Sequence, residues 1–335
     1  MKKRVTIKDI ARELDLSTST VSRALANDKN IRSQTQSRVL SKAKELGYSP
    51  NPIATNLKFG CTNSIGVIVP EMVTPFASAV IEGIQSVLHE KGLRVMIANS
   101  NESSEQEAEN LNLMQQFMVD GVIISLCDYS ANRELFDKFR ESGIPLLFYD
   151  RIPHGIEEST QVVINDYTSA FFLVEELIRS GRKRIAYLAG PKYIYNSKER
   201  ERGYRDAMRK FSLEVEPSMV VTAGVSFDDG AAAVDRVEGC DAIFAFTDTL
   251  AIGAMNRLVR NGVRVPQDVA VAGFSGTELS TIVTPELTSV VAPLFQMGVR
   301  SAEIILDMIA DYNAKPYIET LESEITLRRS THPDS

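Results

Sequence analysis

The stretch TIKDIARELDLSTSTVSRAL, residues 6–25, decides how the rest of the chain is organised. It predicts two short helices joined by a tight turn. The apolar face of the first helix is formed by residues at i, i+3, i+4 and i+7, namely Ile7, Ile10, Ala11 and Leu14. Thr6 and Asp9 approximate a capping box, in which a hydroxyl and an acidic side chain satisfy the first backbone amides. Ser17 offers an N-cap to the second helix, so the segment carries its own start signals.

The second predicted helix separates an apolar face from a polar face. Val21, Ala24 and Leu25 share the apolar face. The polar face presents short or bidentate side chains, namely Thr18, Ser19, Ser22 and Arg23. Such side chains can enter the major groove of DNA and bond base edges, as the second helix of a helix-turn-helix does. The alternative is a small helical pair that only packs against a larger domain.

The charge distribution favours the DNA-binding interpretation. Residues 1–58 contain 12 Lys/Arg and 5 Asp/Glu, a net charge of +7. The rest of the chain holds 25 Lys/Arg and 39 Asp/Glu, a net charge of −14. A basic end on an acidic chain is typical of a protein that binds nucleic acid.

The composition, 44% hydrophobic and 24% charged over 335 residues, predicts a soluble globular protein with more than one domain. No apolar run reaches the ~18 residues that a membrane helix needs, and the basic N-terminus lacks the apolar segment of a secretory signal. Cys61, Cys127 and Cys240 are isolated and odd in number. We therefore expect idle thiols in a reducing cytoplasm, with no disulfide and no metal site.

A third helix and a linker are predicted next. Ser33 and Gln36 repeat the capping-box pattern, and Gly47 is placed to end the helix. Its apolar side is formed by Val39, Ala43 and Leu46. Asn51-Pro52 then matches the start of a further helix over residues 52–58. Because this is far below the ~12–15 residues that an isolated helix needs, we expect it to be disordered until a partner packs against it.

From residue 64 onward, short apolar runs alternate with segments of helical length. The predicted strands are residues 65–69, 94–98, 121–125, 145–149, 162–165, 184–190, 241–246 and 268–274. The predicted helices include residues 76–91, 105–118, 168–181, 198–211 and 248–262. Strands that are apolar throughout indicate parallel sheets covered by helices on both faces. So many units exceed one sheet, and the prediction is an α/β core with two similar lobes and a cleft between them.

Candidate ligand-binding residues follow the predicted strands, because open parallel sheets bind ligands at the carboxyl ends of their strands. These ends are residues 70–76, 150–151, 191–200, 247–248 and 274–275. Their carboxylates, guanidinium groups, hydroxyls and rings suit a small polyhydroxylated molecule. Structural alternatives remain open. Asp248 could be a helix cap, Asp150 and Arg151 could pair with each other on the surface, and Phe76 could belong to the core.

The sequence shows no catalytic constellation. It contains no HExxH, GxSxG or P-loop motif and no dinucleotide-binding fingerprint. Its three His are His89 on a predicted helix, His154 in a loop and His332 in the tail. A protein without enzymatic activity and without a cofactor is therefore favoured.

The chain resembles the LacI/GalR family of bacterial transcriptional regulators over nearly its whole length. Residues 6–25 are similar to the helix-turn-helix signature of that family almost position by position. Asn51-Pro52-Ile53-Ala54 and Leu57 resemble its hinge helix, and the chain from Ser64 resembles its core, which is similar to periplasmic binding proteins. The corresponding domains are residues 1–48, 49–62 and 63–335.

The resemblance implies a cytoplasmic homodimer, of the repressor type, whose paired heads bind a pseudo-palindromic operator. Thr18, Ser19 and Arg23 match base-reading positions, and Leu57 matches a leucine that wedges into the minor groove. The candidate DNA-binding residues are Thr6, Ser17, Thr18, Ser19, Thr20, Ser22, Arg23, Asn51, Ala54 and Leu57.

The resemblance also implies that a small-molecule effector, such as a sugar or sugar derivative, binds in the cleft and controls DNA affinity. The segment NSKERERGY, residues 196–204, resembles a family motif that makes Arg200 the effector-binding arginine. The candidate effector-binding residues are Phe76, Asp150, Arg151, Arg200, Thr247 and Ser275. Ser275 departs from the family pattern, since many members carry an Asp there, so the identity of the effector does not carry over.

Two other classes of function are alternatives to a DNA-binding regulator. An extracytoplasmic solute-binding protein would share the core fold, but the basic head and the missing signal segment argue against it. An enzyme fused to a DNA-binding head is disfavoured by the sparse His and the missing catalytic motifs.

Overall fold

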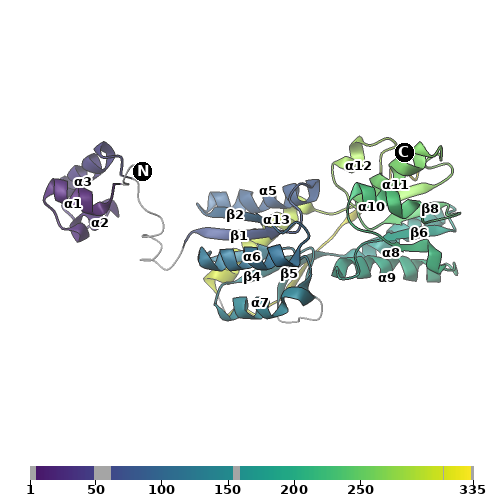
Figure 1. The fold of residues 1–335 in the computed structure, drawn as a ribbon, viewed down its shortest axis with the longest axis horizontal. Helices are drawn as coiled ribbons and strands as arrows, with labels where there is room; N and C mark the ends of the chain where they lie inside the picture. Colours follow the sequence, from purple (N-terminus) through teal and green to yellow (C-terminus); the bar gives the residue numbers. More distant parts are fainter. Residues whose placement is uncertain (1–4, 49–61, 154–158, 312, 333–335) are drawn as a thin grey trace. The chain divides into compact units, whose positions relative to one another are not determined.

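The computed structural model describes residues 5–48, 62–153, 159–311 and 313–332. They belong to two compact units, Met1–Thr62 and Asn63–Ser335 (Figure 1). The predicted hinge helix, residues 52–58, lies outside the described residues.

The first unit contains three helices around a small core, α1 (Ile7–Leu14), α2 (Thr18–Leu25) and α3 (Ser33–Glu45). Its fully buried apolar residues come from all three helices: Ile10, Ala11, Val21, Ala24, Val39 and Ala43. The start signals of the first two helices are confirmed. The backbone amide and the hydroxyl of Thr6 donate to the Asp9 carboxylate at 2.9 and 2.7 Å, and Ser17 Oγ accepts from the Thr20 amide at 3.1 Å.

The predicted capping box of the third helix is wrong. The N-cap of α3 is Arg32, so Ser33 is already helical. The side-chain amide of Gln36 donates to Asn27 Oδ1 in the preceding loop instead of reaching back to the helix start. A tertiary partner has thus taken the group that the local pattern assigned to the cap. The end of the helix agrees with the prediction, because Gly47 follows it in a left-handed conformation with φ +67°.

The second unit contains two six-stranded sheets. The first sheet has the order β11-β5-β4-β3-β1-β2, and its strand pairs are all parallel. Its strands are β1 (Ser64–Val69), β2 (Arg94–Asn99), β3 (Gly121–Ile124), β4 (Leu146–Tyr149), β5 (Thr160–Ile164) and β11 (Ile318–Leu321). The helices that pack with it are α5 (Pro75–Glu90), α6 (Ser104–Gln116), α7 (Tyr129–Glu141) and α13 (Leu294–Ala310).

The second sheet has the order β12-β10-β9-β8-β6-β7 and is parallel except for the β10–β12 pair. Its strands are β6 (Ile185–Ala189), β7 (Val220–Thr222), β8 (Ala242–Ala245), β9 (Ala270–Ser275), β10 (Thr288–Val291) and β12 (Glu324–Thr326). The helices of this lobe are α8 (Asp166–Arg179), α9 (Tyr195–Lys210), α10 (Phe227–Val234), α11 (Asp248–Arg260) and α12 (Leu279–Ile282).

Both faces of the central strands β1, β3, β4, β6, β8 and β9 are buried, as the continuous apolar runs predict. The predicted edge strand β2 is partly exposed. Along β1, Ile65, Val67 and Val69 pack with the cluster that includes α5 and α13. Ile68 points to the opposite face, into the cluster built with α6 and α7. The period of two along a strand thus supplies both layers, and each predicted apolar run from 65 to 274 coincides with a strand.

The chain passes between the two lobes where the sequence could not show it. It crosses at Asn165 between β5 and α8, at Ala292-Pro293 between β10 and α13, and at Glu322-Ser323 between β11 and β12. These three crossovers place the carboxyl ends of both sheets beside one cleft.

Candidate functional site

The polar face of α2 is the candidate DNA-reading surface of the first unit. Thr18, Ser19 and Arg23 are exposed, whereas Thr20 and Ser22 are half-buried. Ser17 Oγ lies 2.8 Å from both Ser19 Oγ and Thr20 Oγ1. Thr6 and Ser17 thus have the capping roles that the sequence predicts, and their contact with DNA stays a prediction. Asn51, Ala54 and Leu57 lie outside the described residues.

An acidic residue that the sequence did not single out orients Arg23. Asp28 Oδ2 lies 3.5 Å from Arg23 Nε. The other oxygen of Asp28 accepts from the backbone and side-chain amides of Asn30 at 2.8 and 2.9 Å. Asp28 thus holds the guanidinium near the surface with part of its fork exposed, as base contact requires.

In the second unit, a cavity of about 470 Å³ lies at the carboxyl ends of strands from both lobes. The structure brings the six predicted effector-binding residues together in its lining: Phe76, Asp150, Arg151, Arg200, Thr247 and Ser275. Residues 225–227, at the start of α10, also line it, with Phe227 45% exposed. Phe76 both lines the cavity and packs against the core, so it has the core position that the sequence left open, and its contact with an effector stays a prediction.

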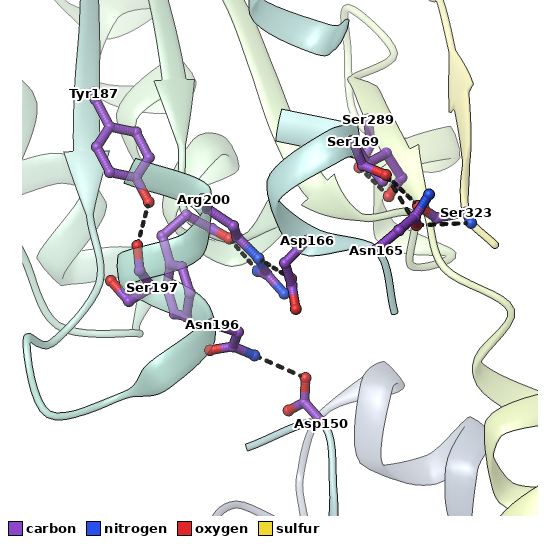
Figure 2. Close-up of polar contacts among 12 residues, drawn as sticks. Asp150, Asn165, Asp166, Ser169, Tyr187, Asn196, Ser197, Arg200, Ser289 and Ser323 are labelled. Atoms are coloured by element: carbon purple, nitrogen blue, oxygen red, sulfur yellow. Dashed lines mark hydrogen bonds and ion pairs between the residues drawn. The ribbon is translucent and has the colours of Figure 1, made fainter. Parts of the chain in front are cut away.

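Arg200 is fixed on four sides. Its Nε donates to Asp166 Oδ1 at 2.7 Å and its Nη1 to the Phe246 carbonyl at 2.7 Å (Figure 2). Its Cζ lies 3.7 Å from the centre of the Phe274 ring and 4.8 Å from that of Phe246. Only 2% of the residue is exposed. The guanidinium is therefore pre-organised before any ligand arrives.

Asp150 forms a bridge between the lobes. Its Oδ1 accepts from Asn196 Nδ2 at 3.0 Å, which joins the end of β4 to α9 (Figure 2). Burial raises the pKa of Asp150, although the positive charges of Arg200 and Arg151 oppose this. The alternative of a surface pair between Asp150 and Arg151 is wrong, because each has a different partner at the cleft.

The partner of Arg151 is Glu102. The two guanidinium Nη atoms donate to the two carboxylate oxygens at 2.7 and 2.8 Å. The side chains are 12% and 24% exposed, so water screens the pair only in part. This is the parallel bidentate geometry of a strong charge-assisted pair.

Thr247, not Asp248, is the N-cap of α11. Thr247 Oγ1 accepts from the Leu250 amide at 3.3 Å. Asp248 accepts from the Thr277 amide at 2.7 Å and from Ser289 Oγ at 2.6 Å, which joins the start of α11 to the segment after β9 and to β10 of the same lobe. Ser275 at the end of β9 has a φ of +117°, a backbone conformation that residues other than glycine rarely adopt.

Two further lining residues carry buried polar atoms without a hydrogen-bond partner among the described residues. These atoms are Ser125 Oγ after β3 and Asn196 Oδ1 on α9, and both residues are 2% exposed. Because a buried polar atom without a partner is costly, each is a candidate contact for a ligand. Both fall at predicted strand ends, at residues 121–125 and 191–200. Position alone could have suggested them, but their missing partners could not be foreseen.

Three further features of the described residues concern metal sites, reactive thiols and membrane-spanning helices. They contain no group of three or more His, Cys, Asp or Glu side chains placed to hold a metal. Burial raises the pKa of Cys127 to about 12 and that of Cys240 to about 11, so both free thiols stay protonated at neutral pH. Within these residues, each helix is too short or too polar to cross a lipid bilayer.

Known proteins resemble both units. Residues 6–51 match the family described as "Bacterial regulatory proteins, lacI family", and residues 174–331 match the "Periplasmic binding protein-like domain". Catabolite control protein A of Priestia megaterium is 32% identical over 98% of this chain and 99% of its own length. The HTH-type transcriptional repressor PurR of Vibrio campbellii is 30% identical over 97% of this chain and 98% of its own length.

A solved structure described as "transcriptional regulator CelR-cellobiose complex" is 28% identical, with a TM-score of 0.75. The similarity covers 98% of this chain and 100% of that one. The capped helix-turn-helix, the two-lobed core and these full-length matches agree with one another. The chain therefore belongs to the LacI family of bacterial transcriptional regulators, which bind DNA through this head and a small-molecule effector through this core.

Proposed function

We propose that this regulator is a cytoplasmic homodimeric repressor whose affinity for a pseudo-palindromic operator is controlled by a small uncharged carbohydrate. It binds the carbohydrate in the cleft of the core and catalyses no reaction on it. The ten candidate DNA-binding residues and the six candidate effector-binding residues are its proposed contacts.

The observation that carries the proposal is the chemistry of the cleft. The two arginines that line it are each engaged by a carboxylate, Arg200 by Asp166 and Arg151 by Glu102. Buried polar atoms of Ser125 and Asn196 await partners, and aromatic rings such as Phe246 supply apolar faces. A sugar combines hydroxyls for the former with an apolar ring face for the latter. The cellobiose complex of a related regulator supports the same class of ligand.

The proposed switch uses the contacts between lobes. The Asn196–Asp150 hydrogen bond joins the two lobes at the cleft, and Asn196 Oδ1 is available to a ligand hydroxyl. A ligand that binds one lobe arrangement better shifts the population toward it. DNA favours one arrangement through residues 52–58, which we propose become helical on the operator. By linkage, the operator then changes ligand affinity by the same factor as the ligand changes operator affinity.

The test has two steps on the full-length protein. A thermal-shift screen of sugars, sugar phosphates, sugar acids and nucleobases identifies the ligand. Fluorescence anisotropy then measures the operator Kd with and without it, over a range of salt concentrations. We expect an uncharged sugar to raise the Tm most and to change the operator Kd, and a salt slope of about −0.9 per phosphate contact. A flat salt dependence would contradict the DNA-binding half, and a nucleobase as the best ligand the carbohydrate half.

A further inference from the structure

A second cavity of about 410 Å³ adjoins the effector cleft, and Arg151 lines both. The second cavity also contains Arg133 from the first lobe and Lys198 from the second. Both are exposed and have no hydrogen-bond or ion-pair partner among the described residues. Three cationic side chains, Arg133, Arg151 and Lys198, therefore line the second cavity, together with one acidic side chain, Asp128.

Glu102 is held beside Arg151 by an unusual backbone. Glu102 has a φ of +55° and Asn101 before it a φ of +49°, so two successive non-glycine residues are left-handed. The Glu102 amide donates to the Pro70 carbonyl at 2.8 Å, which keeps this turn beside the end of β1. Such conformations cost free energy and persist where the surroundings enforce them, often at functional sites. Here the result of the turn is the bidentate pair with Arg151.

The pair determines the charge that a ligand meets. With Glu102 in place, the positive charge of each cleft arginine is neutralised by an ion pair with a carboxylate. The remaining acidic residues of the lining are Glu71, Asp150 and Asp248, and among the described residues no Lys or Arg other than Arg151 and Arg200 lines the cleft. An anionic ligand would lose its hydration without meeting a free cation, which is unfavourable.

We propose that Glu102 sets the charge selectivity of the effector cleft: by occupying both Nη atoms of Arg151, it excludes phosphorylated and carboxylated ligands and admits uncharged ones. The proposal rests on the proposed function of this cleft and deepens it. Without the negative charge of Glu102, Arg151 joins Arg133 and Lys198 as a site for an anion. Glu102 is thus a specificity-determining residue of the cleft that acts through Arg151.

The test uses Glu102→Gln in the full-length protein, with inorganic pyrophosphate as the probe at constant ionic strength. The matched control is Glu71→Gln, which removes the same charge from the same cleft. Glu71 Oε1 accepts from the Val73 amide at 3.0 Å and holds no arginine. Binding is measured by calorimetry, and as the rise in Tm of each variant above its own value without pyrophosphate. The basic head is identical in all variants, so anion binding there cancels in the comparison.

We expect Glu102→Gln to bind pyrophosphate with a Kd at least about tenfold below that of the unaltered protein, because one unit charge is removed at contact distance. Glu71→Gln should change the Kd far less, and adding Arg151→Gln to Glu102→Gln should abolish the gain. If Glu71→Gln gains as much as Glu102→Gln, only the total charge matters and the proposal fails. It also fails if Glu102→Gln gains nothing, or if the unaltered protein already binds pyrophosphate in the cleft.

A failure of this test can be told apart from a failure of the proposed function, because neither the operator nor the natural effector enters the experiment. If Glu102→Gln is less stable, Glu102→Ala provides a second variant with the same expected gain. If the unaltered protein does not bind an operator, the proposed function is contradicted, but the pyrophosphate measurements still decide whether Glu102 sets the charge selectivity of the cleft.

Discussion

At the scale of single residues, Arg200 combines charge, shape and position in the cleft. Its planar group bonds Asp166 and the Phe246 carbonyl while it stacks on Phe274. Arg200→Lys keeps the charge but loses the plane and the fork. We expect the affinity for the ligand that raises the Tm most to fall at least about tenfold, while operator affinity without ligand stays unchanged.

Calorimetry and anisotropy measure the two affinities for Arg200→Lys. The control is Arg202→Lys on the same helix, where the exposed guanidinium lies over the Tyr167 ring at 4.3 Å. Equal ligand affinity in both variants would show that Arg200 is only a structural residue.

Ser275 combines an unfavourable backbone with a polar side chain at the cleft. Its φ of +117° suits glycine, so Ser275→Gly should relieve roughly 1–3 kcal/mol of strain. Glycine also makes the unfolded chain more flexible, which offsets roughly 0.5–1 kcal/mol of this gain. We expect the Tm to rise by roughly 1–3 °C and ligand affinity to fall with the lost hydroxyl.

Scanning calorimetry and ligand titration test Ser275→Gly together. Ser212→Gly is the control, because Ser212 has a φ of +56° and lines neither of the two cavities. It should gain stability without any change in ligand affinity. A lower Tm for Ser275→Gly would mean that its hydroxyl stabilises the fold more than its backbone strains it.

At the scale of elements, the crossing of α5 and α13 depends on two glycines. A Cβ at Gly83 would lie 2.1 Å from the Phe295 carbonyl oxygen, and one at Gly298 would lie 2.0 Å from the Val80 carbonyl oxygen. Backbone atoms cannot move aside as a flexible side chain can. Gly83→Ala gains up to about 1 kcal/mol of helix propensity, but overpacking costs roughly 1–3 kcal/mol and occasionally more.

We therefore expect Gly83→Ala to lower the free energy of unfolding by at least about 1 kcal/mol, as measured by urea denaturation. Ser78→Ala, at an exposed position on the same helix, should change it little. A Gly83→Ala protein as stable as the unaltered one would show that the two helices can separate at no cost.

The elements also show which parts of the molecule a sequence can predict. Strands that are buried on both faces and apolar throughout, such as β1, were predicted. The buried strand β10 was not predicted, because it begins with the polar residues Thr288 and Ser289. The short strands β11 and β12 are half-exposed, and their alternating polar residues gave no such signal. The rule that ligands bind at strand ends predicted Asp150 and Arg151. It could not identify Glu102 or Asn196 as their partners, because a tertiary pairing has no local pattern.

At the scale of the whole second unit, one side chain ties two of the three crossovers together. Asn165 on the first crossover donates to Glu322 on the third at 2.7 Å. Asn165 Oδ1 accepts from the Ser323 amide at 3.1 Å, from Ser323 Oγ at 2.7 Å and from Ser169 Oγ at 3.0 Å (Figure 2). The next residue, Asp166, bonds Arg200 in the cleft. This cluster of hydrogen bonds around Asn165, the Asn165 clamp, therefore joins Arg200, the arginine that we propose binds the ligand, to the segments about which the lobes must turn.

Asn165→Ala should separate these two crossovers and let each bend independently. With the clamp, the lobes turn about two connections, the Asn165–Ser323 cluster and Pro293. Without it, more relative orientations become accessible, so the distribution of distances between the lobes should broaden. Electron–electron double resonance can measure this distribution between spin labels at exposed Glu134 and Glu238, in a background without the natural cysteines.

The matched control is Asn132→Ala, which removes side-chain bonds to the Ser104 carbonyl and Glu107 within one lobe. It should lower stability without broadening the distribution. If Asn165→Ala leaves the distribution as narrow as the control does, the cleft contacts rather than the crossovers restrain the lobes.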